Sequence, residues 1–240
     1  MKLELVAMKN EINNLIVKKY GMDAGASVVG ITASKDFCLA PDGFKPSDVL
    51  KGCQSVIVLG SPFSQEAFKN PVEYTKIRST MLTKMTAIAK EVTKQIKANG
   101  YKAKAISASG GKYIKGEQFG HISLKHAAEL AGLGLINRNY LLTNDQYGNL
   151  LWLSAVLTDA DLIPDEKAQY TVCDNCNKCV EMCPAKALDD LDSFEKKECS
   201  GLSFKMVNRK LQLDCFLCRK VCPYSFGEKT ENAEKIGNNK

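Results

Sequence analysis

Apolar residues recur at helical spacing in two stretches of the first hundred residues. The first stretch covers residues 4–20 and contains Leu5, Met8, Ile12, Leu15 and Ile16. The second runs from Val72 to Asn99, and Gly100 follows it as a typical helix stop. Because apolar residues three and four positions apart share one face of a helix, the pattern predicts one short and one long amphipathic helix.

Three shorter runs have the composition of buried strands. They are SVVGITA (27–33), QSVIVLG (54–60) and YKAKAISAS (101–109). A further short helix is expected over ISLKHAAELAG (122–132), which again ends at a glycine. The runs NYLLTN (139–144) and NLLWLSAVLTD (149–159) flank the turn-forming DQYG, and this arrangement predicts a β-hairpin.

The order of these elements predicts the fold class. Strands and helices mix without a regular strand–helix–strand repeat, so we expect an α+β domain built on a mixed sheet. The cysteines are unevenly distributed, since eight of the ten lie after residue 168. We therefore divide the chain into an α+β domain over 1–168, a cysteine-rich domain over 169–227 and a disordered tail over 228–240.

The composition favours a folded cytoplasmic protein. An apolar fraction of 45% supports a hydrophobic core, and no apolar run is long enough to span a bilayer. The first residues include Glu4 and Glu11 and lack the basic-then-apolar profile of a signal peptide. The net charge of +6 permits an acidic protein partner or a nucleic acid, but a solvated surface explains it equally well.

The segment CDNCNKCVEMCP (173–184) has the spacing C-x2-C-x2-C-x3-C-P, which is typical of bacterial ferredoxins. Thiolates are soft anionic ligands that suit iron–sulfur clusters or zinc, but zinc sites more often use separated C-x2-C pairs. A second, partial run, CFLCRKVCP (215–223), also ends in proline, and Cys199 supplies an eighth thiol. Disulfides are not expected, because the cytosol keeps thiols reduced.

The spacing also predicts which cysteines act together. In ferredoxins of this type three closely spaced cysteines bind one cluster, and the fourth binds the other cluster. One [4Fe–4S] cluster then takes Cys173, Cys176, Cys179 and Cys222, and the other takes Cys183, Cys199, Cys215 and Cys218. Two zinc sites or unligated core thiols are the less favoured alternative. Cys38 and Cys53 stand alone in apolar contexts, so we expect them to be buried bystanders.

Standard catalytic motifs are absent from the rest of the sequence. It contains no G-x-G-x-x-G after a strand, no Walker run and no G-x-S-x-G. His121 and His126 lie near one predicted helix. We interpret them as surface or capping residues, because the sequence gives them no partner for catalysis or metal binding.

The segment AGLGLINRNYLLTNDQYGNLLWLSAVLTD (131–159), followed by the paired cysteine runs, resembles the cobalamin-dependent iron–sulfur reductases. The epoxyqueuosine reductases are the nearer group, and the reductive dehalogenases are the more distant one. The resemblance extends over roughly residues 25–225 and is greatest in the last third of the chain. It adds a second expected cofactor to the two clusters, because these enzymes use a corrinoid.

The resemblance implies a nitroreductase-like domain that binds cobalamin, followed by the ferredoxin-like domain with two clusters. It implies that electrons pass from a low-potential donor such as ferredoxin or flavodoxin through the clusters to cobalt. The residues that match the family's corrinoid-binding segment are Gly132, Gly134, Asn137, Arg138 and Asn139. For Arg138, a solvated surface charge is the alternative interpretation.

Glu73, in VEYTKIR, matches the position of a catalytic aspartate in the epoxyqueuosine reductases. The resemblance implies that its carboxyl group supplies a proton to the substrate. The alternative is a first-turn glutamate that is stabilised by the helix dipole. The replacement of aspartate by glutamate is one departure from the family.

The length of the chain is a second departure. Epoxyqueuosine reductases carry a helical-repeat region after the cluster domain that helps to hold tRNA, and this chain ends at residue 240. We therefore expect a short form without that region, which argues against tRNA as the substrate. The dehalogenases are longer and carry an export signal, so dehalogenation is less favoured still.

We expect a cytoplasmic oxidoreductase, not bound to a membrane, that uses two [4Fe–4S] clusters and a corrinoid to reduce a small or nucleoside-type substrate. Two alternatives stay open. One is a non-catalytic electron carrier whose clusters serve a partner enzyme or a partner's corrinoid. The other is a reductase that binds a flavin in the nitroreductase-like pocket.

Overall fold

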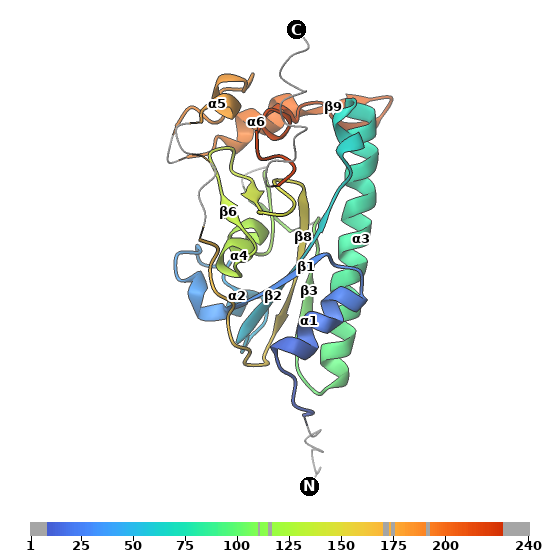
Figure 1. Cartoon of the computed structure of the whole chain (residues 1–240), viewed down its shortest axis with the longest axis vertical. Helices are drawn as coiled ribbons and strands as arrows, with labels where there is room; N and C mark the ends of the chain where they lie inside the picture. The colour runs from blue at the N-terminus through green and yellow to red at the C-terminus, as the bar shows by residue number, and fades with distance from the viewer. Residues whose placement is uncertain are drawn as a thin grey trace. The chain divides into compact units, whose positions relative to one another are not determined.

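The computed structural model describes residues 9–109, 111–114, 117–169, 173, 176–190 and 193–227 (Figure 1). These residues form two compact units that interleave along the chain. The sheet unit takes its residues from Met1–Gly60, Lys84–Gly132 and Leu153–Glu166, and the cysteine unit from Ser61–Thr83, Leu133–Trp152 and Lys167–Lys240. The division near residue 168 stays a prediction. The tail over 228–240, predicted to be disordered, lies outside the described residues.

A four-stranded sheet organises the sheet unit, in the order β1-β2-β8-β3 (Figure 1). Its strands are β1 (Val28–Ala33), β2 (Ser55–Pro62), β8 (Leu151–Thr158) and β3 (Ala103–Ile106). β1 runs antiparallel to β2, with Val28 opposite Gly60, and β3 runs antiparallel to β8, with Ala103 opposite Thr158. The three strands expected from the apolar runs are confirmed.

The two central strands of the sheet are buried because both of their faces are apolar. Val56, Ile57 and Leu59 of β2 and Val156 and Leu157 of β8 have no exposed surface. A continuous apolar run is typical of a strand that is covered on both sides. Full burial of each large aliphatic side chain stabilises the fold by about 1.5–3 kcal/mol, so these strands form the centre of the core.

The long helix expected from the sequence is α3 (Pro71–Ala98). It ends just before Gly100, whose φ of 84° lies in the left-handed region that favours glycine at a helix end. Residues 84–98 of α3 belong to the sheet unit, and Met85, Val92 and Ile96 have no exposed surface. The apolar face that predicted this helix is therefore its buried face.

The first helix begins later than its apolar pattern predicted. α1 spans Asn14–Asp23, because Asn13 caps it and accepts a hydrogen bond from the Ile16 N–H at 3.0 Å. Residues 4–8 of the predicted helix lie outside the described part of the chain. The capping residue, rather than the start of the apolar pattern, sets the helix boundary.

The remaining elements of the sheet unit are short. They are η1 (Ser34–Phe37), α2 (Pro46–Val49), β4 (Lys112–Ile114), β5 (Glu117–Phe119) and α4 (Leu124–Leu130). α4 confirms the short helix expected over 122–132, and the exposed His126 there lies 2.6 Å from the Ser123 hydroxyl. Cys53 is buried as expected, but Cys38 is exposed, so the expectation of burial is wrong for Cys38. No helix in the described part of the chain has both the length and the apolar character needed to cross a membrane.

The predicted hairpin over 139–159 is wrong. Leu142–Thr143 (β7) pairs with Leu135–Ile136 (β6), whereas β8 lies between β2 and β3 in the four-stranded sheet. The DQYG segment still forms a turn, closed by reciprocal backbone hydrogen bonds of 2.8 Å between Asn144 and Gly148. β8 leaves this turn for the central sheet because its apolar residues are buried there on both faces.

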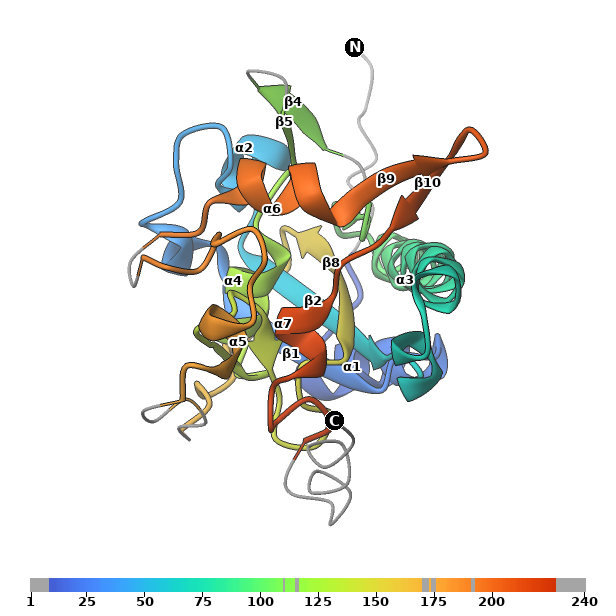
Figure 2. The ribbon, with the colours of Figure 1, turned by 90° about the horizontal axis from the view of Figure 1, so that it is seen from above.

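The cysteine unit is built from short elements around the cysteine runs. They are η2 (Gln65–Phe68), α5 (Lys178–Glu181), α6 (Lys196–Ser203), β9 (Phe204–Val207), β10 (Lys210–Leu213) and α7 (Leu217–Lys220). β9 and β10 form an antiparallel ribbon that extends from the end of α6 (Figure 2). Leu213 at the end of this ribbon donates its N–H to Thr75 Oγ1 on α3 at 2.9 Å.

An aromatic cluster forms the core of the cysteine unit. Tyr74, only 4% exposed, stacks on Phe216 with ring centroids 4.5 Å apart and planes 6° apart. Phe63 and Phe68 lie beside Tyr74, with centroid distances of 5.8 and 6.3 Å. Because Phe216 directly follows Cys215, this packing holds the second cysteine run against the first turns of α3.

Replacing Gly148 with alanine should destabilise the cysteine unit. Gly148 has a φ of 56°, and a Cβ at this position would clash with the backbone of Tyr224 and Ser225. Gly52 is the matched control, because its φ of 82° is also positive but an added Cβ there meets no atom within 4 Å. We expect urea unfolding to show a loss of about 3 kcal/mol or more for Gly148→Ala and about 1 kcal/mol for Gly52→Ala. Equal losses would show that the close backbone approach is unimportant.

Candidate functional site

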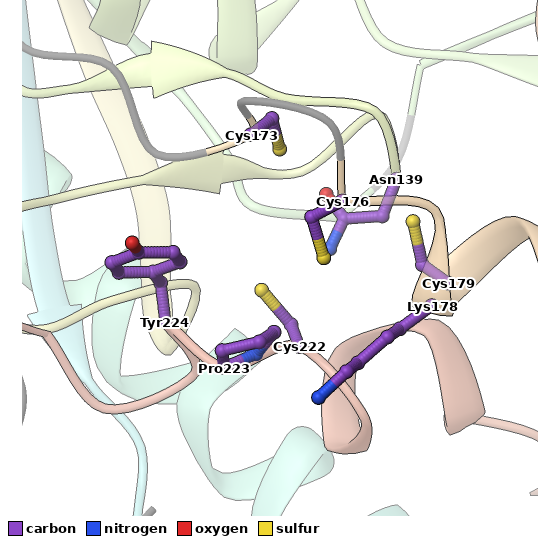
Figure 3. Close-up of a pocket in the computed structure, with 8 residues that line it drawn as sticks. All are labelled: Asn139, Cys173, Cys176, Lys178, Cys179, Cys222, Pro223 and Tyr224. Carbon is purple, nitrogen blue, oxygen red and sulfur yellow. The ribbon is translucent and has the colours of Figure 1, made fainter.

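A pocket in the cysteine unit brings together four of the predicted cluster ligands. Cys173, Cys176 and Cys179 come from the first run, and Cys222 comes from the second (Figure 3). The remaining lining residues of the pocket are Asn139, Lys178, Pro223 and Tyr224. This set is the one that the crossover rule predicts for the first cluster. Its role as a ligand set stays a prediction.

Two short helices position the thiols of this pocket. α5 carries Cys179, which is 8% exposed, and packs against α7, which carries Cys218. The Cys222 carbonyl accepts hydrogen bonds from the N–H and the hydroxyl group of Ser225, at 3.1 and 2.7 Å. Ser225 is buried and also donates its hydroxyl to the Arg219 carbonyl. These bonds fix the turn that follows α7, and with it the position of Cys222.

Burial strongly affects the ionisation of the second run. It raises the pKa of Cys218 to about 12, although the positive charge of Arg219 opposes the rise. Burial likewise raises the pKa of Cys222 to about 11. In the metal-free protein both thiols are therefore protonated at neutral pH. A metal centre that binds them as thiolates must displace these protons.

The electrostatic contacts divide the cysteines into two groups. Cys222 interacts with Cys173 and Cys179, and Cys218 interacts with Cys199, Cys215 and Cys179. Cys222 and its two partners all belong to the set predicted for the first cluster. Cys218, Cys199 and Cys215 belong to the set predicted for the second cluster. Cys179 contributes to both groups because α5 and α7 are in contact. The place of Cys183 in the second set stays a prediction.

No group of three or more histidine, cysteine or acidic residues in the described part of the chain is spaced to hold a single metal ion. The cysteine pocket is nevertheless lined by four thiols. Four thiolates can bind either an iron–sulfur cluster or a zinc ion. The spacing of the cysteines along the sequence remains the argument for a cluster.

Asn139, predicted to lie along a corrinoid, lies at the cysteine pocket. It is 5% exposed, and its Nδ2 donates to the Cys218 carbonyl at 3.2 Å. Its Oδ1 accepts the Leu141 N–H at 3.1 Å, across Tyr140, which has a positive φ of 55°. Asn139 therefore connects the segment before β7 to the second cysteine run.

The two neighbouring predicted residues have buried donors without partners. Asn137 Nδ2 and Arg138 Nε and Nη1 are inaccessible to solvent and have no hydrogen-bond partner among the described residues. Gly134 is buried with a φ of 152°, and Gly132 has a φ of 72° at the end of α4. These backbone conformations favour glycine, and the unpaired donors are groups that a ligand with carbonyl oxygens would satisfy.

Glu73, the predicted proton donor, lies in the first turn of α3. Its N–H donates to Asn70 Oδ1 at 3.0 Å, and its carboxylate is 3.9 Å from Lys76 Nζ. The side chain is 37% exposed and is not among the described residues that line the cysteine pocket. Its catalytic role stays a prediction. These contacts also agree with the alternative, in which Glu73 is a first-turn glutamate stabilised by the helix dipole.

The sequence analysis missed Asn149, which is buried and binds the second cysteine run. Its N–H donates to the Ser225 carbonyl at 3.2 Å, and its Nδ2 donates to the Arg219 carbonyl at 3.3 Å. Its side chain also makes a hydrogen bond with Cys222 that opposes the rise in the pKa of this thiol. The available signal was a polar residue at the start of the apolar run NLLWLSAV, where a buried amide needs partners.

The sequence is similar to epoxyqueuosine reductases. It is 31% identical over 112 residues to the epoxyqueuosine reductase of Lactococcus garvieae (strain Lg2), a match that covers 42% of this chain and 31% of that protein. The matched region spans about a third of the length of the curated relatives. No protein-family model matches the chain.

Solved structures of two enzyme classes share the fold. A crystal structure of epoxyqueuosine reductase with an epoxyqueuosine-modified tRNA stem loop has a TM-score of 0.62 at 16% identity, over 87% of this chain and 64% of that one. A reductive dehalogenase whose structure suggests a mechanism for B12-dependent dehalogenation has a TM-score of 0.68 at 20% identity, over 92% and 33%. The chain therefore has a mixed α/β fold similar to both, and the resemblance seen in its sequence is confirmed.

Asn149→Ala should destabilise the protein by about 2 kcal/mol, because it removes the buried side-chain hydrogen bonds to the Arg219 carbonyl and to Cys222. Urea unfolding measures this loss. The exposed Asn10 provides the control, and Asn10→Ala should change stability by less than about 0.5 kcal/mol. A loss no larger than that of the control would mean that Asn149 does not hold the second run.

Proposed function

We propose that this protein is an iron–sulfur oxidoreductase that holds two [4Fe–4S] clusters and a corrinoid and reduces a small or nucleoside-type substrate. The observation that carries the proposal is the pocket in which Cys222 joins Cys173, Cys176 and Cys179. Crossed sets of this kind are typical of two-cluster ferredoxins. The second cluster is proposed to take Cys183, Cys199, Cys215 and Cys218.

The chain's part in electron transfer is to hold two sets of thiols close together, most of them half-buried. Iron–sulfur clusters, when bound, supply one-electron transfer at low potential. The contact between α5, which carries Cys179, and α7, which carries Cys218, supports two adjacent sets. Two clusters held side by side can pass electrons from one to the other, so adjacent sets favour an electron relay over two independent structural sites.

The buried donors of Asn137 and Arg138 support the corrinoid part of the proposal. A buried donor without a partner costs about 1–3 kcal/mol, so a ligand that accepts from these groups is favoured. A corrinoid carries amide side chains whose carbonyl oxygens are suitable acceptors, and when bound it supplies a cobalt centre that reduces substrates. Gly132, Gly134 and Asn139 are proposed as further members of the same binding segment.

The fold is proposed to combine a nitroreductase-like domain over 1–168 with a ferredoxin-like domain over 169–227. The mixed sheet of β1, β2, β8 and β3, together with α3, supports the first part. The short helices α5 and α7, each within a cysteine run, support the second. The interleaved compact units imply that segments of the first domain also hold the cysteine runs.

The substrate class is proposed by analogy with the relatives, because function belongs to the site rather than to the fold. One related structure contains a modified tRNA stem loop and another concerns B12-dependent dehalogenation. A nucleoside-type or other small substrate is proposed from these two relatives. Glu73 is proposed to supply the proton, and a low-potential ferredoxin or flavodoxin is proposed to supply the electrons.

Anaerobically reconstituted protein should contain about eight irons and eight sulfides per chain, since eight cysteines are available for two clusters. Elemental analysis measures both. Cys222→Ser should change the EPR signal of the cluster assigned to Cys176, and Cys183→Ser should change that of the cluster assigned to Cys218. Cys176→Ser and Cys218→Ser provide the reference spectra.

The isolated cysteines are the controls for this experiment. Replacing Cys38 and Cys53 with alanine should leave the iron content unchanged, because neither belongs to a set. Two zinc ions per chain without visible absorption would contradict the cluster assignment. If Cys183→Ser damages the Cys176 cluster alone, each run binds its own cluster and the crossed sets are wrong.

Cluster-replete protein should bind cobalamin, with a shift in the cobalamin spectrum on titration. Arg138→Gln removes part of the buried donor group and should weaken binding by at least about tenfold, which is about 1.4 kcal/mol. The exposed Arg209 is the matched control, and Arg209→Gln should leave the affinity unchanged. An absence of cobalamin binding, together with normal electron transfer to a partner protein, would favour the electron-carrier alternative.

A further inference from the structure

The segment from Lys196 to Leu213 has an excess of basic over acidic residues. It contains five basic residues and one acidic residue, in a chain whose net charge is +6. Arg209 and Lys210, at the turn between β9 and β10, are both exposed. A concentration of one sign of charge on a small surface attracts partners of the opposite sign.

The same segment exposes apolar side chains. Met206 is 66% exposed and Leu211 is 55% exposed, and the register of the ribbon places them opposite each other. Cross-strand partners share one face, so these two side chains form one apolar patch. Leu202, at the end of α6, and Val207, on the other face of the ribbon opposite Lys210, are also exposed, at 37% and 41%. Single exposed apolar residues are ordinary, but a group of them with a basic border is typical of an interaction site.

The ribbon that carries this patch is structurally well defined. Asn208 and Arg209 both have positive φ values, 49° and 61°, as a two-residue type I′ hairpin turn requires. At its base the Asp214 N–H donates to the Ser203 carbonyl at 2.7 Å, and Lys205 forms an ion pair with Asp214. The patch is therefore presented on a closed hairpin rather than on an irregular loop.

Two predicted ligands of the second cluster flank the base of the ribbon. Cys199 lies on α6, with its Sγ 3.5 Å from Ser203 Oγ, and Cys215 directly follows Asp214. Met206 lies three residues beyond Ser203, which is about 10 Å along a strand. Figure 2 shows the ribbon extending directly from α6. A protein seated on this ribbon would lie beside the second set of thiols.

We propose that the ribbon formed by β9 and β10 docks an acidic, low-potential electron-transfer protein. This inference rests on the proposed function, because it assigns the ribbon to the delivery of electrons. The basic residues at the turn complement an acidic partner, and Met206 with Leu211 supplies the apolar centre of the contact. In each encounter the donor loses one electron and this protein gains it, with no bond formed or broken.

RNA is a less suitable occupant of this surface. Proteins that bind single-stranded RNA stack its bases on aromatic side chains or arginine planes. The ribbon offers one exposed arginine, Arg209, and its exposed apolar residues, Met206, Val207 and Leu211, are all aliphatic. An apolar aliphatic patch with a basic border instead fits a protein surface.

The test uses cluster-replete protein and a reduced acidic flavodoxin in stopped-flow measurements. Met206→Ser/Leu211→Ser and Arg209→Glu/Lys210→Glu should each lower the second-order rate constant by at least about tenfold at low salt. The wild-type rate should also fall as ionic strength rises. Leu39→Ser, at a residue 95% exposed, and Lys90→Glu/Lys94→Glu, with the same charge change, are the controls and should stay within about twofold of wild type.

Two further measurements separate this proposal from the proposed function. Titanium(III) citrate, which needs no docking surface, should reduce all variants at the wild-type rate. Calorimetric titration with flavodoxin should show the same loss of affinity in the ribbon variants, and it does not depend on the clusters. If the protein takes up no iron, the proposed function is wrong. If the ribbon variants still lose affinity for flavodoxin in that case, the docking surface remains supported.

Other results would overturn the docking proposal itself. The docking proposal is wrong if the ribbon variants bind flavodoxin, and accept electrons from it, as the wild type does. If the same variants instead abolish a dimer in sedimentation experiments and still bind flavodoxin, the patch is an interface between copies of this chain. If they lose affinity only for an RNA stem loop, the basic residues serve a nucleic acid.

Discussion

The cysteine unit depends on the close contact between the turn over 144–149 and the backbone that follows Cys222. Asn149 connects the two segments through hydrogen bonds to Arg219 and Ser225. Gly148 and Gly227 lie so close to the opposite backbone that neither has room for a Cβ. A buried amide that loses such partners costs about 1–3 kcal/mol, so this contact is specific as well as stabilising. It brings Cys222 to the pocket that the first cysteine run lines.

Elements that depend on local sequence patterns could be predicted, whereas pairing between distant segments could not. The strands over 27–33 and 54–60 and the long helix α3 follow from apolar periodicity, which the sequence displays directly. The hairpin over 139–159 was wrong because β8 is apolar on both faces, and such a strand can pair on either side. The start of α1 depends on the cap at Asn13, which an apolar pattern does not reveal.

In the candidate site, too, some features could be predicted from sequence patterns and others could not. The spacing of the cysteines predicted that Cys222 joins the first run, because a motif with a fixed geometry carries long-range information. The roles of Asn139 and Asn149 were not visible, since an asparagine in a sequence does not reveal which carbonyl its amide meets. Asn139 was predicted to bind a cofactor, which stays a prediction, and the structure adds that its amide donates to the Cys218 carbonyl. Buried amides in apolar surroundings deserve to be treated as structural connectors before they are assigned to a ligand.

The shared fold says less about the chemistry of this protein than the side chains of its candidate site do. Similar folds occur in an epoxyqueuosine reductase and in a reductive dehalogenase, at TM-scores of 0.62 and 0.68, although these enzymes act on different substrates. What distinguishes two proteins with a shared fold lies in the side chains of their sites rather than in the fold. In this chain Glu73 is partly exposed beside Lys76. We propose that the position of Glu73, together with the unpaired donors of Asn137 and Arg138, determines which substrate and cofactor this chain binds.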